Sequence, residues 1–162
     1  MKPKIKEIPE MIIVGTVASG NTVGDIYIHE LWGLFEKNKQ SIKHKIEGKS
    51  YEVHICGEYS GTNKHYCIVG VEVKKTEDVP LDMFVKVIPA GKYAVFTHQF
   101  KNGSYGKAYE TINDWLRQAE YEGSFPFDIQ CYDKRFQGTS HPESEIEFYI
   151  PIKKKIKSER LS

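Results

Sequence analysis

The same order of predicted elements occurs twice in this chain, and this repeat limits the folds available to it more than any other feature. In the first half, an apolar run at residues 11–17 predicts a strand, and residues 51–56 and 66–73 predict a hairpin around the turn residues 60–63. Between the first strand and the hairpin, apolar side chains recur at the i, i+3, i+4, i+7 spacing of an amphipathic helix. These side chains are Ile28, Leu31, Trp32 and Phe35.

The second half repeats this order after residue 78. Residues 93–100 predict a strand, and residues 127–133 and 145–152 predict the two strands that follow the helix. An additional strand at 84–88, which Pro89-Ala90-Gly91 separates from the next one, is expected to bridge the two halves. The predicted helix carries an apolar stripe formed by Tyr105, Ala108, Tyr109, Ile112, Trp115, Leu116 and Ala119.

Two fused β-α-β-β modules account for this pattern. A chain of 162 residues is long enough for a domain with a sizeable core, so we predict a single domain over 1–162 with pseudo-repeat halves at about 8–78 and 79–157. The predicted fold class is α+β, with antiparallel sheets and two helices on one face. A cleft between the two modules is the expected ligand site.

Composition excludes several classes of protein. Hydrophobic residues make up 40% of the chain and charged residues 28%, which is typical of a globular protein rather than a disordered or membrane-spanning one. A net charge of +1 provides no general attraction to nucleic acid or anionic lipid, so we expect neither direct DNA binding nor a membrane partner. The three cysteines lack CxxC spacing, and the apolar run at 11–14 is too short for a signal peptide. We therefore expect a cytoplasmic protein.

Alternation along the predicted strands assigns side chains to the two faces of the sheet. In the last strand, Phe148 and Ile150 are expected beneath the helices, and Glu147 and Tyr149 on the opposite, open face. The same reasoning places Tyr132 beside Glu147. It assigns Val53, Ile55, Cys67, Val69, Val71, Phe127, Ile129 and Cys131 to the helix side, and His54, Cys56, Tyr66, Ile68, Asp128 and Gln130 to the open side.

Glu147 is the central polar residue of this predicted open face. One interpretation is a solvated strand residue, which is common on the outer face of an antiparallel sheet. Another is a carboxylate among aromatic rings that pairs with an organic cation, to which each ring adds roughly 0.5–2 kcal/mol. A third is a general base whose pKa is raised by partial desolvation. The alternation pattern leaves all three open.

Four side chains in the predicted hairpin are of types that bind metals, in the pairs His54-x-Cys56 and His65-x-Cys67. Imidazole and thiolate groups suit zinc. The predicted alternation places the first pair on the open face and the second on the helix side, so the donors would not converge. We therefore expect no metal and no cofactor. The chain also lacks the motifs of P-loop proteins, Rossmann dinucleotide-binding proteins, α/β-hydrolases and zincins.

Several segments of the chain resemble the GyrI-like effector-binding domains. They are residues 83–98, Ala108-Tyr109, Asn113-Asp114-Trp115-Leu116, Tyr132-Asp133 and Glu147-Phe148-Tyr149-Ile150-Pro151-Ile152. The resemblance is strong over residues 80–153, and Gly15, Trp32-Gly33 and residues 66–72 keep the expected order in the first half.

This resemblance implies two fused SHS2-type modules around a ligand cleft. In multidrug-sensing members, a glutamate four residues before the proline of the final strand lies at the cleft floor and pairs with cationic ligands. Glu147 matches that position, and Tyr149 would line the same wall. Members occur alone or fused to AraC-type or MerR-type DNA-binding domains, and we expect a standalone member here.

We therefore expect a small-molecule effector-binding protein, linked to transcriptional or drug response, whose ligand is an aromatic or cationic organic compound. Binding without catalysis is the main hypothesis. One alternative is a hydrolase of cyclopropane-type or other drug-like electrophiles in which Glu147 activates water. Another is a gyrase-inhibitor-like role, with gyrase or a separate regulator as the protein partner. The predicted ligand-binding residues are Glu147, Tyr149, Tyr132, Tyr66, Ile68 and Trp115.

Overall fold

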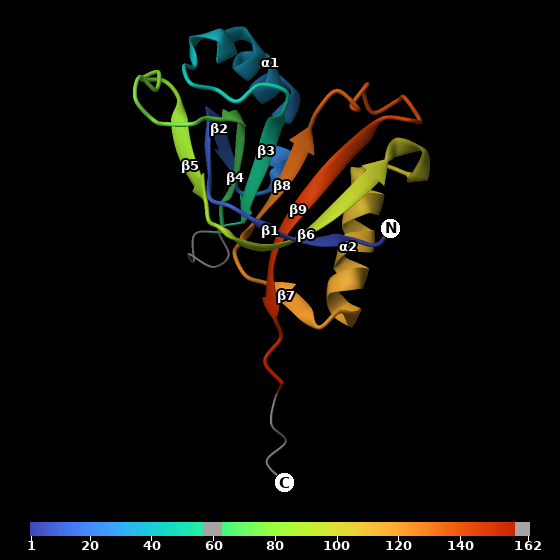
Figure 1. Cartoon of the computed structure of the whole chain (residues 1–162). Coiled ribbons are helices and arrows are strands. Elements are labelled where there is room, and N and C mark those ends of the chain that lie inside the picture. Colours follow the sequence, from blue (N-terminus) through green and yellow to red (C-terminus); the bar gives the residue numbers. More distant parts are fainter. Residues whose placement is uncertain (57–62, 158–162) are drawn as a thin grey trace.

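The computed structural model describes residues 1–56 and 63–157, so residues 60–62 of the predicted turn lie outside the described part. Two α-helices and nine strands form this part of the chain (Figure 1). The strands are β1 (Lys4–Ile8), β2 (Met11–Gly20), β3 (Ser50–Cys56), β4 (His65–Glu72), β5 (Phe84–Ile88), β6 (Gly91–Gln99), β7 (Tyr121–Gly123), β8 (Phe127–Tyr132) and β9 (Glu145–Lys154). The helices are α1 (Ile28–Asn38) and α2 (Tyr105–Gln118), with short 3-10 turns at Val23–Asp25, Lys39–Ser41 and Phe100–Asn102.

The predicted order of elements is confirmed in both halves. β2, α1, β3 and β4 form the first strand-helix-strand-strand unit, and β6, α2, β8 and β9 form the second. β5 pairs with β2, so the additional strand of the second half does join the first half, as expected. Sequence analysis missed β1 and β7, which are short and carry charged side chains; they pair with β6 and β9.

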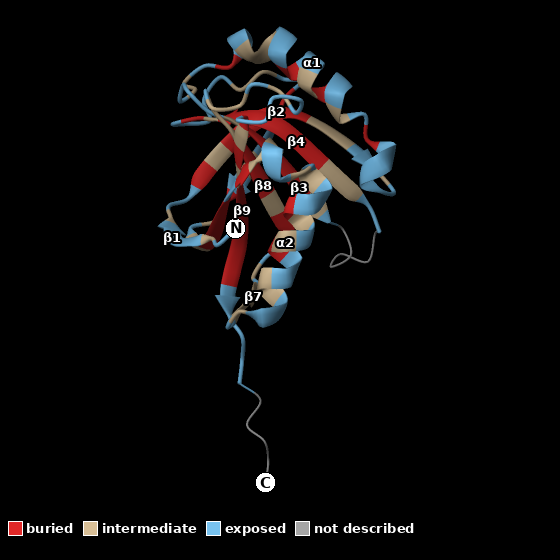
Figure 2. Ribbon diagram, turned by 90° about the vertical axis from the view of Figure 1, so that its right-hand side faces the viewer, coloured by how far each residue is buried: buried red, intermediate tan, exposed pale blue. Residues whose placement is uncertain are grey.

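One antiparallel sheet runs through both units, in the order β1-β6-β9-β8-β3-β4-β2-β5. The pairing of β3 with β8, in which Val53 lies opposite Ile129, joins the two halves at its centre. The sheet is curled, and the two helices lie along different parts of it (Figures 1 and 2). Among the described residues, neither helix is long and apolar enough to cross a membrane.

Cross-strand register defines the two faces of this sheet, because residues directly opposite each other point to the same side. One row crosses β4, β3, β8, β9 and β6 through Val69, Glu52, Gln130, Phe148 and Phe96. The opposite face carries the row formed by Ile68, Val53, Ile129, Tyr149 and Val95.

Both helices pack on the face that carries the first row, which confirms the predicted placement of two helices on one side. α1 buries Leu31 and Phe35 in a cluster with Val69. α2 buries Ala108 and Ile112 in a separate cluster with Phe96 and Phe148. The expected position of Phe148 beneath a helix is therefore also confirmed.

The second face is not open, because the sheet curls around a third core. Strands from both ends of the sheet contribute to this cluster, including Met11 from β2, Ile88 from β5 and Tyr93 from β6. Tyr149 packs in the same cluster, pointing away from α2 as predicted, but it is buried rather than exposed.

The predicted orientation of the two central strands is wrong. Val53, Phe127, Ile129 and Cys131 belong to the enclosed core, and Ile55 packs against it, so none of them faces the helices. Alternation identified the apolar parity of β3 and β8 correctly. It could not identify which face of the sheet carries this apolar set, because both faces of the two strands are covered. In the structure, the apolar set faces the enclosed core.

A glycine pair holds β2 and β4 in close contact. Gly15 and Gly70 lie opposite each other, and a Cβ atom at position 70 would be 2.4 Å from the carbonyl oxygen of Val14. Gly33, on the exposed side of α1, has no atom within 4 Å of the corresponding position.

We predict that Gly70→Ala lowers the free energy of unfolding by about 1–3 kcal/mol, because the backbone must move to admit the methyl group. Gly33→Ala is the control and is expected to raise it by up to about 1 kcal/mol through helix propensity. Urea denaturation of the two variants measures both values. An unchanged stability in Gly70→Ala would show that β2 and β4 are farther apart than described.

Candidate functional site

A cavity of about 1110 Å³ lies between the two helices, above the centre of the sheet. Trp32 from α1 and Tyr105 and Tyr109 from α2 form part of its walls. Its floor is formed by β3 and β8, which are visible between α1 and α2 in Figure 2. The cavity thus occupies the junction of the two halves, where a cleft was expected.

Polar side chains from both central strands form the floor. Glu52 and His54 on β3, and Asp128, Gln130 and Tyr132 on β8, all line the cavity. Register explains their convergence, since Glu52 is opposite Gln130 and His54 is opposite Asp128. These residues lie between the apolar cluster beneath α1 and the one beneath α2. Their side chains point to the face of the sheet opposite to the enclosed core.

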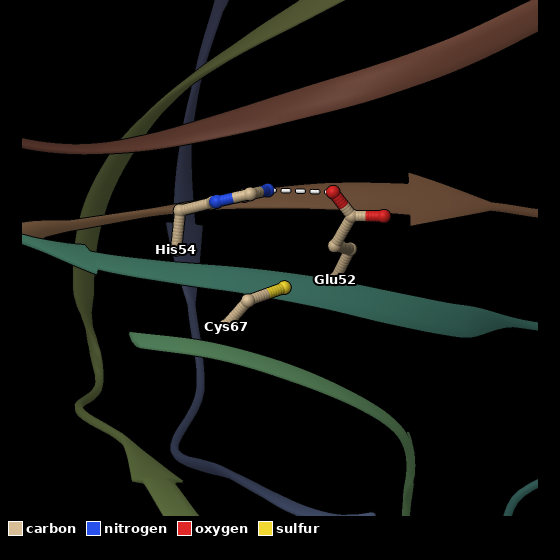
Figure 3. Close-up of side chains that lie close together, drawn as sticks. All are labelled: Glu52, His54 and Cys67. Carbon is tan, nitrogen blue, oxygen red and sulfur yellow. Dashed lines mark hydrogen bonds and ion pairs between the residues drawn. The ribbon is translucent and has the colours of Figure 1, made fainter. Parts of the chain in front are cut away.

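Glu52 is buried, with 4% of its surface exposed, and both of its carboxylate oxygens have partners. The indole Nε1 of Trp32 donates a hydrogen bond to Oε2 over 2.6 Å. The imidazole Nε2 of His54 lies 2.6 Å from Oε1. The dashed line in Figure 3 marks this contact. The helix therefore supplies one donor to this carboxylate, and its own strand supplies the other.

His54 continues the chain of polar contacts to the neighbouring strand. Its Nδ1 lies 2.9 Å from Nε2 of His65. Burial alone lowers the His54 pKa, but the hydrogen bond and charge of Glu52, with the charge of Asp128, outweigh it and raise the pKa above its ordinary value. Burial, and then the charge of His54, lowers the pKa of His65. Of the two imidazoles, His54 is therefore the one whose protonated form is favoured by its surroundings.

A second network surrounds Asp128. The hydroxyl of Tyr109 donates to Oδ1 of Asp128 over 3.0 Å, and the amide of Gln130 donates to the Tyr109 oxygen over 2.9 Å. The Tyr132 hydroxyl donates to Gln130 Oε1 over 2.6 Å. Burial raises the pKa of Asp128, and it also raises the pKa values of Tyr109 and Tyr132, which keeps the phenols protonated as donors.

Aromatic rings stand around these acids. The rings of Trp32 and Tyr132 meet at 5.1 Å between centroids and 73° between planes, and Phe136 lies 4.9 Å from Tyr132. Within the described residues, neither Glu52 nor Asp128 forms an ion pair with lysine or arginine. Lys39, Lys45 and Lys49 line the cavity elsewhere, and of these Lys39 pairs with Glu36 and Lys45 with Glu47. The site therefore combines a buried carboxylate, that of Glu52, and a partly buried one, that of Asp128, with aromatic walls, an arrangement that suits a cation.

Among the six predicted ligand-binding residues, all described here, Tyr132 lines this cavity and the other five do not. Ile68 and Tyr149 pack in the enclosed core. Tyr66 is partly buried on β4, opposite Ile55. Trp115 packs in the α2 cluster, with its ring perpendicular to that of Phe96.

Glu147 lies on the opposite face of the sheet from Tyr132, so the predicted contact between them is wrong. Its register partner on β8 is Cys131, because successive strand residues point to opposite faces. The Glu147 carboxylate accepts a hydrogen bond from the Tyr149 hydroxyl over 3.1 Å and lies 3.4 Å from Arg135. A role for Glu147 in ligand binding stays a prediction.

Sequence analysis missed Trp32, Glu52 and Asp128 as a group of interacting residues. The sequence did contain a relevant pattern, because polar residues alternate with apolar ones along both β3 and β8 and therefore share one face of each strand. The missing information was the antiparallel pairing of these two strands, which places Glu52 opposite Gln130, 78 positions later in the chain.

The predicted separation of the two His/Cys pairs onto opposite faces is also wrong. Register places His54 opposite Cys67 and Cys56 opposite His65, so all four side chains lie on the same face of the β3–β4 hairpin. The sequence-based assignment gave β3 the wrong face, and that error separated the two pairs.

The chain is similar to a known family of binding domains and to a transcriptional regulator. The model of the GyrI-like small molecule binding domain matches residues 1–153. The transcriptional regulator BrlR of Pseudomonas aeruginosa is 33% identical over 156 residues, which cover 94% of this chain and 56% of BrlR. The chain thus spans just over half the length of this relative.

Two solved structures share the fold. The structure of SAV2435 bound to tetraphenylphosphonium has a TM-score of 0.70 at 15% identity and covers 94% of both chains. The C-terminal domain of EcmrR has a TM-score of 0.69 at 17% identity, covering 95% of this chain and 98% of that domain.

The contact between Trp32 and Glu52 generates a stability prediction. Trp32→Phe and Glu52→Gln, combined in a double-mutant cycle, are expected to show a coupling energy of about 1.5–3 kcal/mol, the range for a hydrogen bond to a charged group. Urea denaturation of the four proteins measures it. The matching cycle with Trp115→Phe should be additive within about 0.5 kcal/mol, because Trp115 packs in a different cluster. Additivity in the Trp32 cycle would contradict the described contact.

Proposed function

Because the chain belongs to the GyrI-like family of small-molecule-binding domains, we propose that its cavity binds an aromatic organic cation. One observation carries this proposal. The buried carboxylate of Glu52 and the partly buried carboxylate of Asp128 share a floor with the imidazole of His54 beneath aromatic walls. A ligand that brings positive charge and flat apolar surface complements both features.

The burial of acidic groups in this cavity favours a cationic ligand. Removing a carboxylate from water costs several kcal/mol unless charge and hydrogen bonds compensate it. Trp32 and Tyr109 supply neutral donors to Glu52 and Asp128, which satisfy oxygen atoms but add no full positive charge, whereas His54, beside Glu52, adds positive charge only in its protonated form. A bound cation would supply that charge, and each aromatic ring that it contacts would add roughly 0.5–2 kcal/mol.

The size of the cavity supports a ligand of drug-like dimensions. Its volume of about 1110 Å³ lies just above the range of roughly 300–1,000 Å³ that is typical of small-molecule sites. Tetraphenylphosphonium, which is bound in the SAV2435 structure, combines a single positive charge with aromatic rings and is a suitable probe. The relationship to BrlR supports a link between ligand binding and transcription, although the chain spans 56% of that regulator.

Hydrolysis is the second candidate function, and the pairing of Glu52 with His54 favours it. A carboxylate and an imidazole 2.6 Å apart in a cavity can hold and transfer a proton, as a general acid–base pair does. In that case a drug-like electrophile would be converted rather than retained. Product formation that is lost in Glu52→Gln would distinguish hydrolysis from simple binding.

We predict that tetraphenylphosphonium binds with micromolar affinity, near −8 kcal/mol. Glu52→Gln keeps the shape of the side chain and removes its charge, so it should weaken this binding by about 1.5–3 kcal/mol, or roughly 10- to 150-fold. Isothermal titration calorimetry measures both affinities. The neutral compound triphenylphosphine oxide should bind the two proteins with similar affinity.

Glu147→Gln is the matched comparison, since it makes the same change on the opposite face. We expect it to leave cation binding unchanged, because Glu147 already lies beside Arg135. Loss of cation binding in Glu147→Gln with retention in Glu52→Gln would instead support Glu147 as the anchor. Equal loss of the cation and of the neutral compound in Glu52→Gln would indicate a collapsed cavity rather than a missing charge.

A further inference from the structure

The buried part of the β3–β4 hairpin brings three different metal-binding groups together. Glu52, His54 and Cys67 each offer a ligand atom, and these atoms lie within 4.8 Å of one another (Figure 3). All three residues are buried. We propose that they form a binding site for a divalent transition-metal ion, with zinc as the preferred ion, at the floor of the cavity.

Strand geometry explains why the three groups converge. Glu52 and His54 are two residues apart on β3 and share a face, and Cys67 is the cross-strand partner of His54 on β4. Each group is therefore positioned by the hydrogen-bonded ladder of the sheet rather than by a loop. Rigid elements of this kind hold metal ligands more accurately than loops do.

The atoms that would not bind the metal are already held by other residues. Trp32 donates to Oε2 of Glu52, which leaves Oε1 facing His54. His65 lies 2.9 Å from Nδ1 of His54, which leaves Nε2 facing Glu52. Metal-binding carboxylates and imidazoles typically have such second partners, which orient them toward the ion.

The chemistry of the donor set selects the class of metal. One thiolate, one imidazole and one carboxylate suit zinc, whereas magnesium and calcium prefer oxygen ligands throughout. Three protein ligands leave a fourth tetrahedral position, and Glu52 and His54 both line the cavity, so this position would be open to water or to a ligand. The nearby carboxylate of Asp128, opposite His54, adds further negative charge.

Metal binding requires a small rearrangement and the release of protons. The present 2.6 Å between Oε1 and Nε2 is a hydrogen bond, and ligand atoms at zinc–ligand distances of about 2.0–2.2 Å lie roughly 3.3–3.5 Å apart. The two groups would therefore separate by less than about 1 Å as the ion enters. The proton between them and the thiol proton of Cys67 would pass to solvent, because the ion binds neutral imidazole and thiolate.

This inference goes beyond the proposed function and can fail separately from it. The metal and an organic cation would both use Glu52, so they should compete. Saturating zinc is therefore expected to weaken tetraphenylphosphonium binding.

Cobalt provides the direct test, because a thiolate ligand gives Co²⁺ a charge-transfer absorption band. The full chain, treated with a chelator and then dialysed, is titrated with Co²⁺ alone and then with Zn²⁺. We expect one equivalent of Co²⁺ to produce the band and Zn²⁺ to remove it by displacement. Absence of the band in the folded protein would overturn the proposal.

Variants identify the ligands. Cys67→Ser should lose the band, whereas Cys131→Ser, which alters a buried thiol on the opposite face, should keep it. Glu52→Gln should weaken Zn²⁺ binding while keeping the thiolate band at higher metal concentration. His65→Gln removes a supporting contact and should weaken Zn²⁺ binding roughly 10- to 100-fold. Circular dichroism confirms the fold of each variant.

Two results would overturn the site. One is a band that survives in Cys67→Ser but is lost in Cys56→Ser, which would place the metal at the exposed end of the hairpin. The other is equal Zn²⁺ affinity in the wild type and in Glu52→Gln. Zinc binding as expected in a protein that does not bind tetraphenylphosphonium would support the metal site and contradict the proposed function.

Discussion

The antiparallel pairing of β3 with β8 is the contact on which the rest of the structure depends. It joins two strand-helix-strand-strand units into one sheet and fixes the distance between the helices that each unit carries. The helices bury separate apolar clusters, and the central strands lie between those clusters. The cavity lies at this junction, between α1 and α2, which lie along different parts of the sheet (Figure 2).

The same pairing brings the acidic groups together, and the helices make their burial possible. α1 contributes the indole of Trp32 to Glu52, and α2 contributes the hydroxyl of Tyr109 to Asp128. Each helix therefore packs apolar side chains against the sheet and also satisfies a carboxylate at the edge of that contact. Buried acids with neutral donors are unfavourable for stability alone, and such groups concentrate at functional sites.

The acidic residues on the two faces of the sheet have different charged partners. On the enclosed side, Glu147 lies beside Arg135, so the chain itself provides the opposite charge. On the cavity side, the cationic partner available to Glu52 within the described residues is His54, a group that can lose its proton. A metal ion or an organic cation could replace that proton, which is why both proposals converge on the same carboxylate.

Much of the fold follows from the sequence, because local patterns indicate the type of secondary structure. The apolar stripes around Trp32 and Trp115 indicate helices, and the alternation in β4 and β9 indicates strands. The resemblance of residues 80–153 to the GyrI-like domains likewise depends on sequence alone. The site required the tertiary structure. Alternation shows that Glu52 and His54 point to the face opposite to Val53. Side chains on both faces of β3 are buried, because the curl of the sheet encloses one face and the helices lie over the other, so only the packed structure decides which set meets the helices. The contact of Trp32 with Glu52, and of His54 with Cys67, depends on pairing between distant segments, which no local pattern encodes.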